Sequence, residues 1–233
     1  MLLSMKIFSD ILDRLLTAPG ETTGGPLTQR SNPPRPARPT TGSARKPELT
    51  GRDGKPTSTI PPPTVYLLLD VSQSMDEGKL RQARDGGVSF AEDAVSKGYL
   101  VGVIQFSTVA RLRVEPTTNR RTIEKGLSQV GLQMTTNMAA AIELATNLFG
   151  RSKGQRAMVL VTDGYPDDAS AALVAADQAK GRGITIIAIG TDDADRNFLK
   201  KLASASELAT TVPDAELKVA IASAARLLPA RRP

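Results

Sequence analysis

Apolar runs and segments of helical periodicity alternate along residues 64–228, and this alternation predicts the fold. Residues 64–70 form a run of apolar and β-forming side chains with no polar break before Asp70. Such a run is typical of a strand buried on both faces, as in a parallel sheet that helices cover. By the same reasoning, strands are expected at 64–70, 99–106, 109–114, 158–162, 184–189 and 208–212.

Helical patterns lie between these strands. They place helices at about 77–97, 119–128, 137–149, 168–181, 195–204 and 214–228. Asp214 is expected to cap the last of them. Residues 109–114 alternate between apolar and polar, which favours an antiparallel strand at an edge. The sequence therefore predicts a doubly wound (Rossmann-like) α/β fold, with a mostly parallel six-stranded sheet, one antiparallel edge strand and helices on both faces.

The N-terminal quarter of the chain has a different pattern. Residues 1–17 place apolar side chains at helical spacing, which predicts an amphipathic helix. Residues 18–62 hold most of the 16 prolines and few large apolar side chains, which predicts a disordered Pro/Arg-rich linker. The folded domain is then expected at 63–228, followed by a basic tail at 229–233. The helix either packs on its own domain or docks in the groove of a second partner, and both alternatives stay open.

Composition excludes several classes of chemistry. The chain contains no Cys and no His. Disulfides, thiolate zinc sites and Ser-His-Asp catalysis are therefore excluded, and any metal ion must be held by oxygen ligands.

The formal charge of +6 lies mainly outside the expected domain. Basic residues gather in the segment 18–62 and in the C-terminal tail, so the domain itself is close to neutral. A specific nucleic-acid-binding surface is not expected, because it needs positive charge on a folded face. No apolar run reaches the ~18 residues that a membrane span needs, and the N-terminus lacks the pattern of a signal peptide. We therefore expect a cytoplasmic protein.

Three loops carry the candidate chemistry, and each follows an expected strand or precedes an expected helix. The first supplies Asp70, Ser72 and Ser74, the second supplies Thr136, and the third supplies Asp163. In parallel sheets the carboxyl ends of the strands open onto the ligand crevice, so these side chains are expected to meet there. Carboxylates, hydroxyls and water are the ligands that a small hard divalent cation prefers.

These motifs resemble the von Willebrand factor type A (VWA) family, in its stand-alone bacterial form. Asp70-x-Ser72-x-Ser74 is similar to the first motif of the metal-ion-dependent adhesion site (MIDAS) of that family. Thr136 is similar to the threonine of the second motif, and Asp163 in Thr-Asp-Gly to the third. The resemblance covers about 64–228, and implies that Asp70, Ser72, Ser74, Thr136 and Asp163 hold Mg²⁺ or Mn²⁺.

The resemblance also implies a function. The expected role is a non-enzymatic interaction module in which a partner protein supplies a carboxylate to the metal, as in adaptors of AAA+ ATPase or stress and conflict systems. Residues beside the ligands are expected to contact that partner, namely Gln73, Met75, Asn137 and Tyr165. Two alternatives stay open. One is a Mg²⁺-dependent enzyme on phosphorylated substrates, with Asp167 or Asp168 as base. The other is a structural subunit with an incidental metal.

Overall fold

Six strands form one sheet in the computed structural model of the chain, which describes residues 61–150 and 154–228. They pair in the order β3-β2-β1-β4-β5-β6. Their bounds are β1 (Thr64–Asp70), β2 (Leu100–Phe106), β3 (Ala110–Thr117), β4 (Arg156–Thr162), β5 (Thr185–Thr191) and β6 (Ala209–Val212). Only the pairing of β2 with β3 is antiparallel in this sheet; the other four pairings are parallel. The predicted fold class is confirmed.

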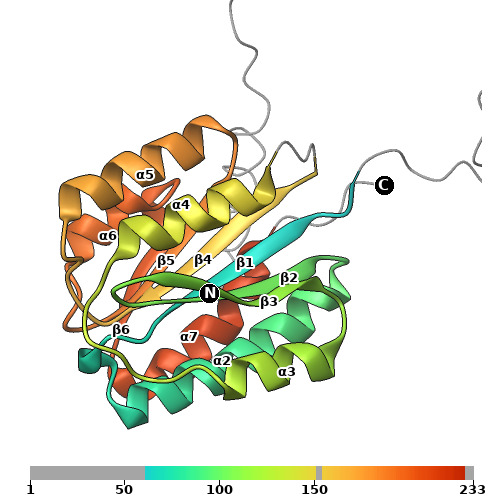
Figure 1. Cartoon of the computed structure of the whole chain (residues 1–233), viewed down its shortest axis with the longest axis horizontal. Helices are drawn as coiled ribbons and strands as arrows, with labels where there is room; N and C mark the ends of the chain where they lie inside the picture. Colours follow the sequence, from blue (N-terminus) through green and yellow to red (C-terminus); the bar gives the residue numbers. More distant parts are fainter. Residues whose placement is uncertain (1–60, 151–153, 229–233) are drawn as a thin grey trace, which may run out of the picture. The chain divides into compact units, whose positions relative to one another are not determined.

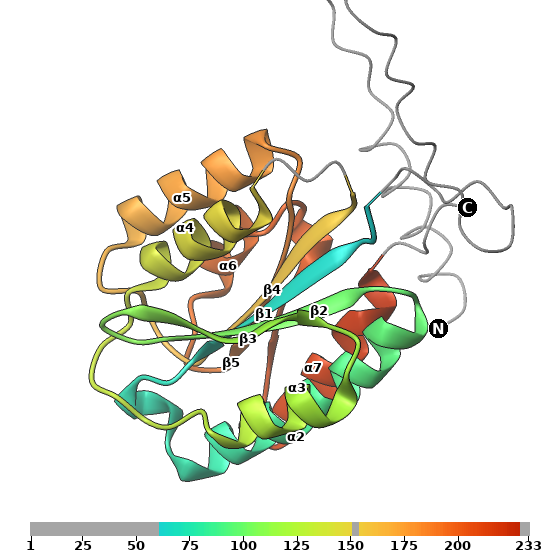
Figure 2. The same ribbon diagram turned by 45° about the vertical axis from the view of Figure 1, so that its right-hand side comes forward.

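Helices cover both faces of the sheet (Figures 1 and 2). Helices α4, α5 and α6 lie over one face, and α2, α3 and α7 over the other. Their bounds are α2 (Glu77–Ser96), α3 (Arg120–Ser128), α4 (Met138–Phe149), α5 (Ala169–Gly181), α6 (Arg196–Leu202) and α7 (Leu217–Ala224). Short 3₁₀ turns complete the described elements, namely η1 (Gln73–Met75), η2 (Ser206–Leu208), η3 (Asp214–Glu216) and η4 (Ala225–Leu227).

The position of β1 determines where a ligand can bind. Its apolar side chains are fully buried because strands pair on both sides and helices pack above and below. From β1 the chain moves outward to β2 on one side, and it later returns to β4 on the other. The boundary between β1 and β4 is therefore the switch point of the sheet, where the crevice at the carboxyl ends binds ligands in folds of this class.

Helix α2 packs closely against α7 through a glycine. A Cβ atom on Gly86 would lie 2.7 Å from the carbonyl oxygen of Lys218 and 3.0 Å from the Cβ of Ile221. Such distances are shorter than normal van der Waals contacts, so the two helices approach each other at a point where only a hydrogen fits. This contact holds α2 in position, and with it the first turn of the helix, which lies next to the carboxyl ends of the strands.

The structure corrects the prediction for the last helix. Asp214 does not cap it: the helical segment opens with the 3₁₀ turn η3, and α7 begins only at Leu217, with no side-chain cap. It also ends earlier than expected, since α7 stops at Ala224 and η4 follows. The predicted helix at 1–17, linker at 18–62 and tail at 229–233 lie outside the described residues. Within 61–150 and 154–228, no helix combines the length and apolar character of a membrane span.

Candidate metal centre

A buried carboxylate at the end of β1 forms the base of the site. Asp70 is fully buried, and its Oδ1 accepts a hydrogen bond of 2.9 Å from the main-chain N–H of Ser72. Its Oδ2 accepts one of 2.6 Å from the hydroxyl of Thr162, the last residue of β4. Burial raises the pKa of Asp70 to about 6, although these hydrogen bonds act in the opposite direction. The carboxylate is thus held in place, at an electrostatic cost that a nearby cation would relieve.

A chain of hydroxyl groups connects the first loop to the third. Ser74 Oγ donates a hydrogen bond of 2.8 Å to Asp163 Oδ1, across 89 residues of sequence. Ser72 Oγ lies 3.0 Å from Ser74 Oγ. The structure therefore brings together four of the five predicted ligands, from the ends of two neighbouring strands.

The loop that carries Thr136 is held against the other two by its main chain. The N–H of Thr136 donates to Asp167 Oδ1 at 3.1 Å, and the N–H of Asp167 donates back to the carbonyl of Thr136 at 3.0 Å. Gln133 N–H also donates to the carbonyl of Val71 at 2.6 Å. Thr136 is buried, and the loop that carries it is bonded to the first loop at Val71 and to the third at Asp167. Asp167, considered above as a catalytic base, thus acts as a clamp between two loops.

Lys79 is a charged neighbour of the site that the sequence analysis missed. Its Nζ lies 3.0 Å from Asp163 Oδ2 and 3.1 Å from Asp193 Oδ2, and its side chain is only 10% exposed. Burial alone would lower the pKa of Lys79. Hydrogen bonds to Asp163 and Asp193, together with the charges of Asp163 and Asp214, outweigh that effect and raise the pKa. Lys79 is therefore a permanent cation beside one of the two candidate metal-binding carboxylates.

The donor set fits a hard divalent cation better than a soft one. Two buried carboxylates and two hydroxyls converge, and all are oxygen donors. Among the described residues no group of three or more acidic, His or Cys side chains gathers to hold an ion. A cation at the carboxyl ends of β1 and β4 would therefore depend on hydroxyl and water oxygens for most of its shell, which is the kind of coordination that Mg²⁺ accepts.

The predicted partner-binding residues differ in their exposure. Gln73 is exposed and Tyr165 is 66% exposed, whereas Asn137 is half-buried and caps α4 by accepting a hydrogen bond from the N–H of Ala140. Met75 is fully buried, so its assignment as a partner contact is wrong. The 3₁₀ turn η1 directs this apolar side chain inward, where its burial is favourable.

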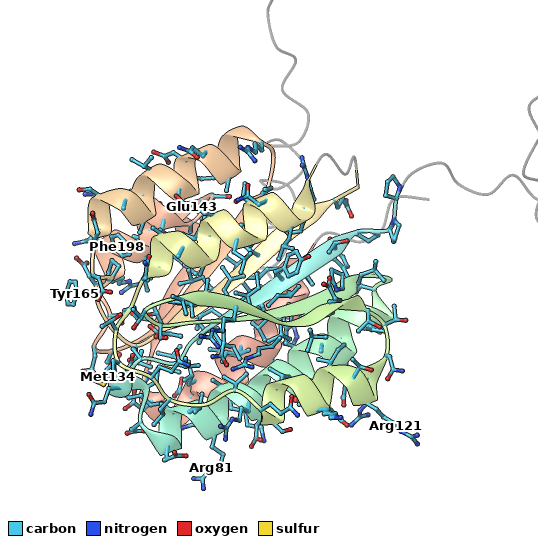
Figure 3. All side chains as sticks on the ribbon, viewed as in Figure 1. Arg81, Arg121, Met134, Glu143, Tyr165 and Phe198 are labelled. Carbon is cyan, nitrogen blue, oxygen red and sulfur yellow. The ribbon has the colours of Figure 1, made fainter. Side chains whose placement is uncertain are left out.

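An exposed methionine was missed among the partner-binding candidates. Met134 is 74% exposed, and Figure 3 places it with Tyr165 at the end of the molecule where β1 and β4 finish. Large apolar side chains that stay exposed beside a candidate binding site are typical of interaction surfaces. An apolar residue directly before the Thr135-Thr136 pair was the signal that could have identified it.

Comparison with known structures supports the fold. One structure is proximal thread matrix protein 1 of the mussel byssus with a zinc-occupied MIDAS motif, at 21% identity and a TM-score of 0.62. It matches over 71% of this chain and 47% of that chain. Another is the von Willebrand factor domain of the pilus tip protein Mfa5 from Porphyromonas gingivalis, at 15% identity and a TM-score of 0.64. It matches over 70% of this chain and 94% of that one. At these identities the likeness shows the fold alone.

Sequence comparison identifies relatives and a family. A protein named "UPF0353 protein" from Mycobacterium sp. (strain KMS) is 29% identical, over 61% of this chain and 53% of the relative. One with the same name from Mycolicibacterium paratuberculosis (strain ATCC BAA-968 / K-10) is 31% identical, over 61% and 50%. The chain thus spans about half the length of these curated relatives. The family model described as the von Willebrand factor type A domain matches residues 64–223. The chain belongs to the von Willebrand factor type A domain family.

Proposed function

We propose that this chain is a metal-dependent protein-binding module. In this proposal Asp70, Ser72, Ser74, Thr136 and Asp163 hold one Mg²⁺ or Mn²⁺, and an acidic residue of a partner protein completes the coordination. When bound, the metal supplies positive charge and one coordination position at which a partner's carboxylate can replace water. The carboxylates of the chain offset its charge, and the hydroxyls orient it.

The contact between Ser74 and Asp163 is the observation that carries the proposal. Two loops 89 residues apart place an oxygen donor and a carboxylate 2.8 Å from each other at the switch point of the sheet. The buried Asp70 carboxylate is held in the same place by the last residue of β4. Natural proteins rarely bury acidic groups unless they are paired or bind a cation, so this arrangement favours a cation-binding role.

The surroundings of the site favour binding a partner over catalysis. VWA domains are generally interaction modules without enzymatic activity, and the side chains of Tyr165 and Met134 stand exposed beside the candidate site. Asp167, the best-placed base for an enzymatic alternative, is engaged with the main chain of Thr136. A partner that presents an acidic residue between apolar ones would match both the metal and this rim. An adaptor role in a multi-protein system is part of the same proposal.

Thermal unfolding with and without metal tests the proposal. We expect millimolar Mg²⁺ to raise the melting temperature of the full chain, and EDTA to reverse the effect, since a ligand of the folded state stabilises it. Asp70→Ala should abolish this response while the circular dichroism spectrum stays that of a folded protein. It should also abolish Mg²⁺-dependent capture of acidic partners.

A matched control is available five residues after Asp163. Asp168 is exposed and caps α5 by accepting a hydrogen bond of 2.9 Å from the N–H of Ala171. Asp168→Asn removes one negative charge close to the site but keeps a good cap, so its response to Mg²⁺ should match that of the wild type. If partner capture is unchanged in EDTA, partner binding does not depend on a metal ion and the proposal is wrong.

A further inference from the structure

Lys79 occupies a position that the helix itself does not favour. It lies in the first turn of α2, where its N–H donates to the N-cap residue Asp76 at 2.8 Å. The N-terminal end of a helix carries partial positive charge, so acidic side chains are preferred there and a lysine is disfavoured. Local conflicts of this kind are expected where a residue serves function rather than stability.

The backbone before α2 shows the same conflict. Asp76 is the one non-glycine residue with a positive φ in the described part of the chain, at φ 25°. Such a conformation is unfavourable for a residue with a side chain and persists only where the surroundings enforce it. Asp76 lies between the loop of Ser72 and Ser74 and the first turn of α2, which carries Lys79. The segments before and after this strained residue therefore both contribute side chains to the site.

The contacts of Lys79 explain what holds it there. Its ammonium donates to Asp163 Oδ2 and to Asp193 Oδ2, and also to the carbonyl of Ser74 at 3.4 Å. Asp214 lies 3.8 Å away on the segment before α7, where it was expected to serve as a helix cap. Asp163 thus has its two oxygens divided: Oδ1 accepts from Ser74, and Oδ2 accepts from Lys79.

We propose that Lys79 is an internal cation that competes with the metal for Asp163. In the metal-free protein it neutralises a carboxylate that is 1% exposed and has no other cation within ion-pair distance among the described residues. When a divalent ion binds, the same positive charge opposes it. Lys79 therefore stabilises the metal-free fold and weakens the affinity for Mg²⁺. This inference rests on the proposed function, because it assumes that Asp163 is a metal ligand.

A weakened affinity has a consequence for partner binding. With Asp163 partly neutralised, the ion is left with less negative charge than two free carboxylates would give. A carboxylate from a partner then supplies charge as well as a ligand, and it should bind more strongly to the metal-loaded site. Lys79 would in this way couple occupancy of the metal site to the presence of the partner.

A purely structural role for Lys79 predicts the opposite sign. If the lysine only positions Asp163, its removal would weaken Mg²⁺ binding and lower stability at every metal concentration. If it competes with the metal, its removal strengthens Mg²⁺ binding. Lys79→Met should then bind Mg²⁺ roughly ten- to a hundredfold more tightly, since one positive charge is removed beside a divalent ion.

The experiment is an isothermal titration of the full chain with Mg²⁺, together with melting temperatures in EDTA and in saturating Mg²⁺. We expect Lys79→Met to melt lower than the wild type in EDTA, because Asp163 is left buried without its counter-ion. The difference should shrink or vanish in saturating Mg²⁺. Lys79→Gln, which keeps a hydrogen-bond donor but loses the charge, should also bind Mg²⁺ more tightly, and Lys79→Arg should stay within about threefold of the wild type.

Lys97 offers a matched control. It ends the same helix, about 27 Å along the helix axis at 1.5 Å per residue, and it is partly buried, with Nζ donating to the carbonyls of Ala225 and Leu228. Lys97→Met removes the same charge and a similar number of hydrogen bonds, and its affinity for Mg²⁺ should match that of the wild type.

The possible outcomes separate the two proposals. Unchanged or weaker Mg²⁺ binding in Lys79→Met, with normal binding in the wild type, overturns the role of Lys79 and leaves the metal site in place. Equal tightening in Lys97→Met overturns it as well, because the effect would then be general. Failure of both the wild type and Lys79→Met to bind Mg²⁺ overturns the proposed function, and this inference with it.

Discussion

The carboxyl ends of β1 and β4 bury polar and charged groups, whereas the contact between α2 and α7 buries backbone and apolar atoms at the closest spacing that a glycine permits. Both regions are well packed, and Lys79 and Asp214 connect them. They differ in what burial does to stability. At the helix contact, burial favours the folded state. At the sheet edge, Lys79 already neutralises Asp163, but burial disfavours the charged form of Asp70 until a metal ion binds. Binding and stability are therefore expected to respond to different mutations.

The largest expected effect is an increase in stability on mutation at the sheet edge, whereas mutation at the helix contact should lower stability. Asp70→Asn should stabilise the metal-free protein by up to about 3 kcal/mol at pH 7, because the amide avoids the cost that raises the carboxyl pKa from 3.8 to about 6. The amide can still accept from Ser72 and donate to Thr162. The same variant should lose its response to Mg²⁺. Urea unfolding in EDTA measures the first effect, and a variant less stable than the wild type would count against the account.

The pH dependence of the metal-free protein should follow the same group. The pKa of Asp70 in the folded state is above its ordinary value, so the folded state binds this proton more tightly than the unfolded state does. Its contribution to stability is therefore fully present below about pH 4 and is lost as the pH rises through about 6. The unfolding free energy of the wild type minus that of Asp70→Asn should fall over this window by up to about 3 kcal/mol. A flat difference would show that Asp70 is not desolvated.

Mutations of helical glycines, one at the contact between α2 and α7 and one at the end of α5, should change stability alone. Gly86→Ala places a methyl group 2.7 Å from the carbonyl of Lys218 and should destabilise the fold by about 1–3 kcal/mol. Gly181 is the last residue of α5, and an added Cβ there would have nothing within 4 Å. Gly181→Ala should therefore raise the unfolding free energy by roughly 0.5–1 kcal/mol. Chemical denaturation gives both values. The affinity of either variant for Mg²⁺ should be unchanged, and a tenfold change would mean that the regions are not independent.

The smallest effect is expected at the exposed rim. Tyr165→Ala and Met134→Ala remove side chains that are largely in solvent, so each should change the unfolding free energy by less than about 0.5 kcal/mol. Their affinity for Mg²⁺ should also stay within about twofold of the wild type. Any loss of partner capture in these variants can then be assigned to contact with the partner. If either variant is destabilised by more than about 1 kcal/mol, that side chain contributes to the packing of the fold and is not a free surface residue.

The sheet was predictable because its signals are local. Continuous apolar runs ending in Asp70 and Thr162 marked two central strands, and the alternating run near residue 110 marked the antiparallel edge strand. The strand β3 continues to Thr117 through Pro116, which an edge strand tolerates because no ladder hydrogen bond needs that position. The loops with oxygen donors were predictable for the same reason, since each follows or precedes such an element.

The parts that were missed depend on distant residues. In the sequence, Lys79 is only one more polar position of an amphipathic helix. Its partners Asp163 and Asp193 lie 84 and 114 residues away. Met75 follows a binding motif, and only the three-dimensional path of the turn shows that it points inward. Asp214 has the residue type of a helix cap but lies within ion-pair distance of Lys79. In each case the decisive interaction joins segments that local pattern does not relate.

Isothermal titration of the wild-type chain with Mg²⁺, repeated on Asp163→Asn, is the decisive experiment for a metal ion held at the ends of β1 and β4. We expect one bound ion per chain for the wild type. In Asp163→Asn the affinity should fall at least a hundredfold, because one of the two carboxylates is lost. If the wild-type chain binds no Mg²⁺, or if Asp163→Asn binds it as well as the wild type, these residues do not form a metal site.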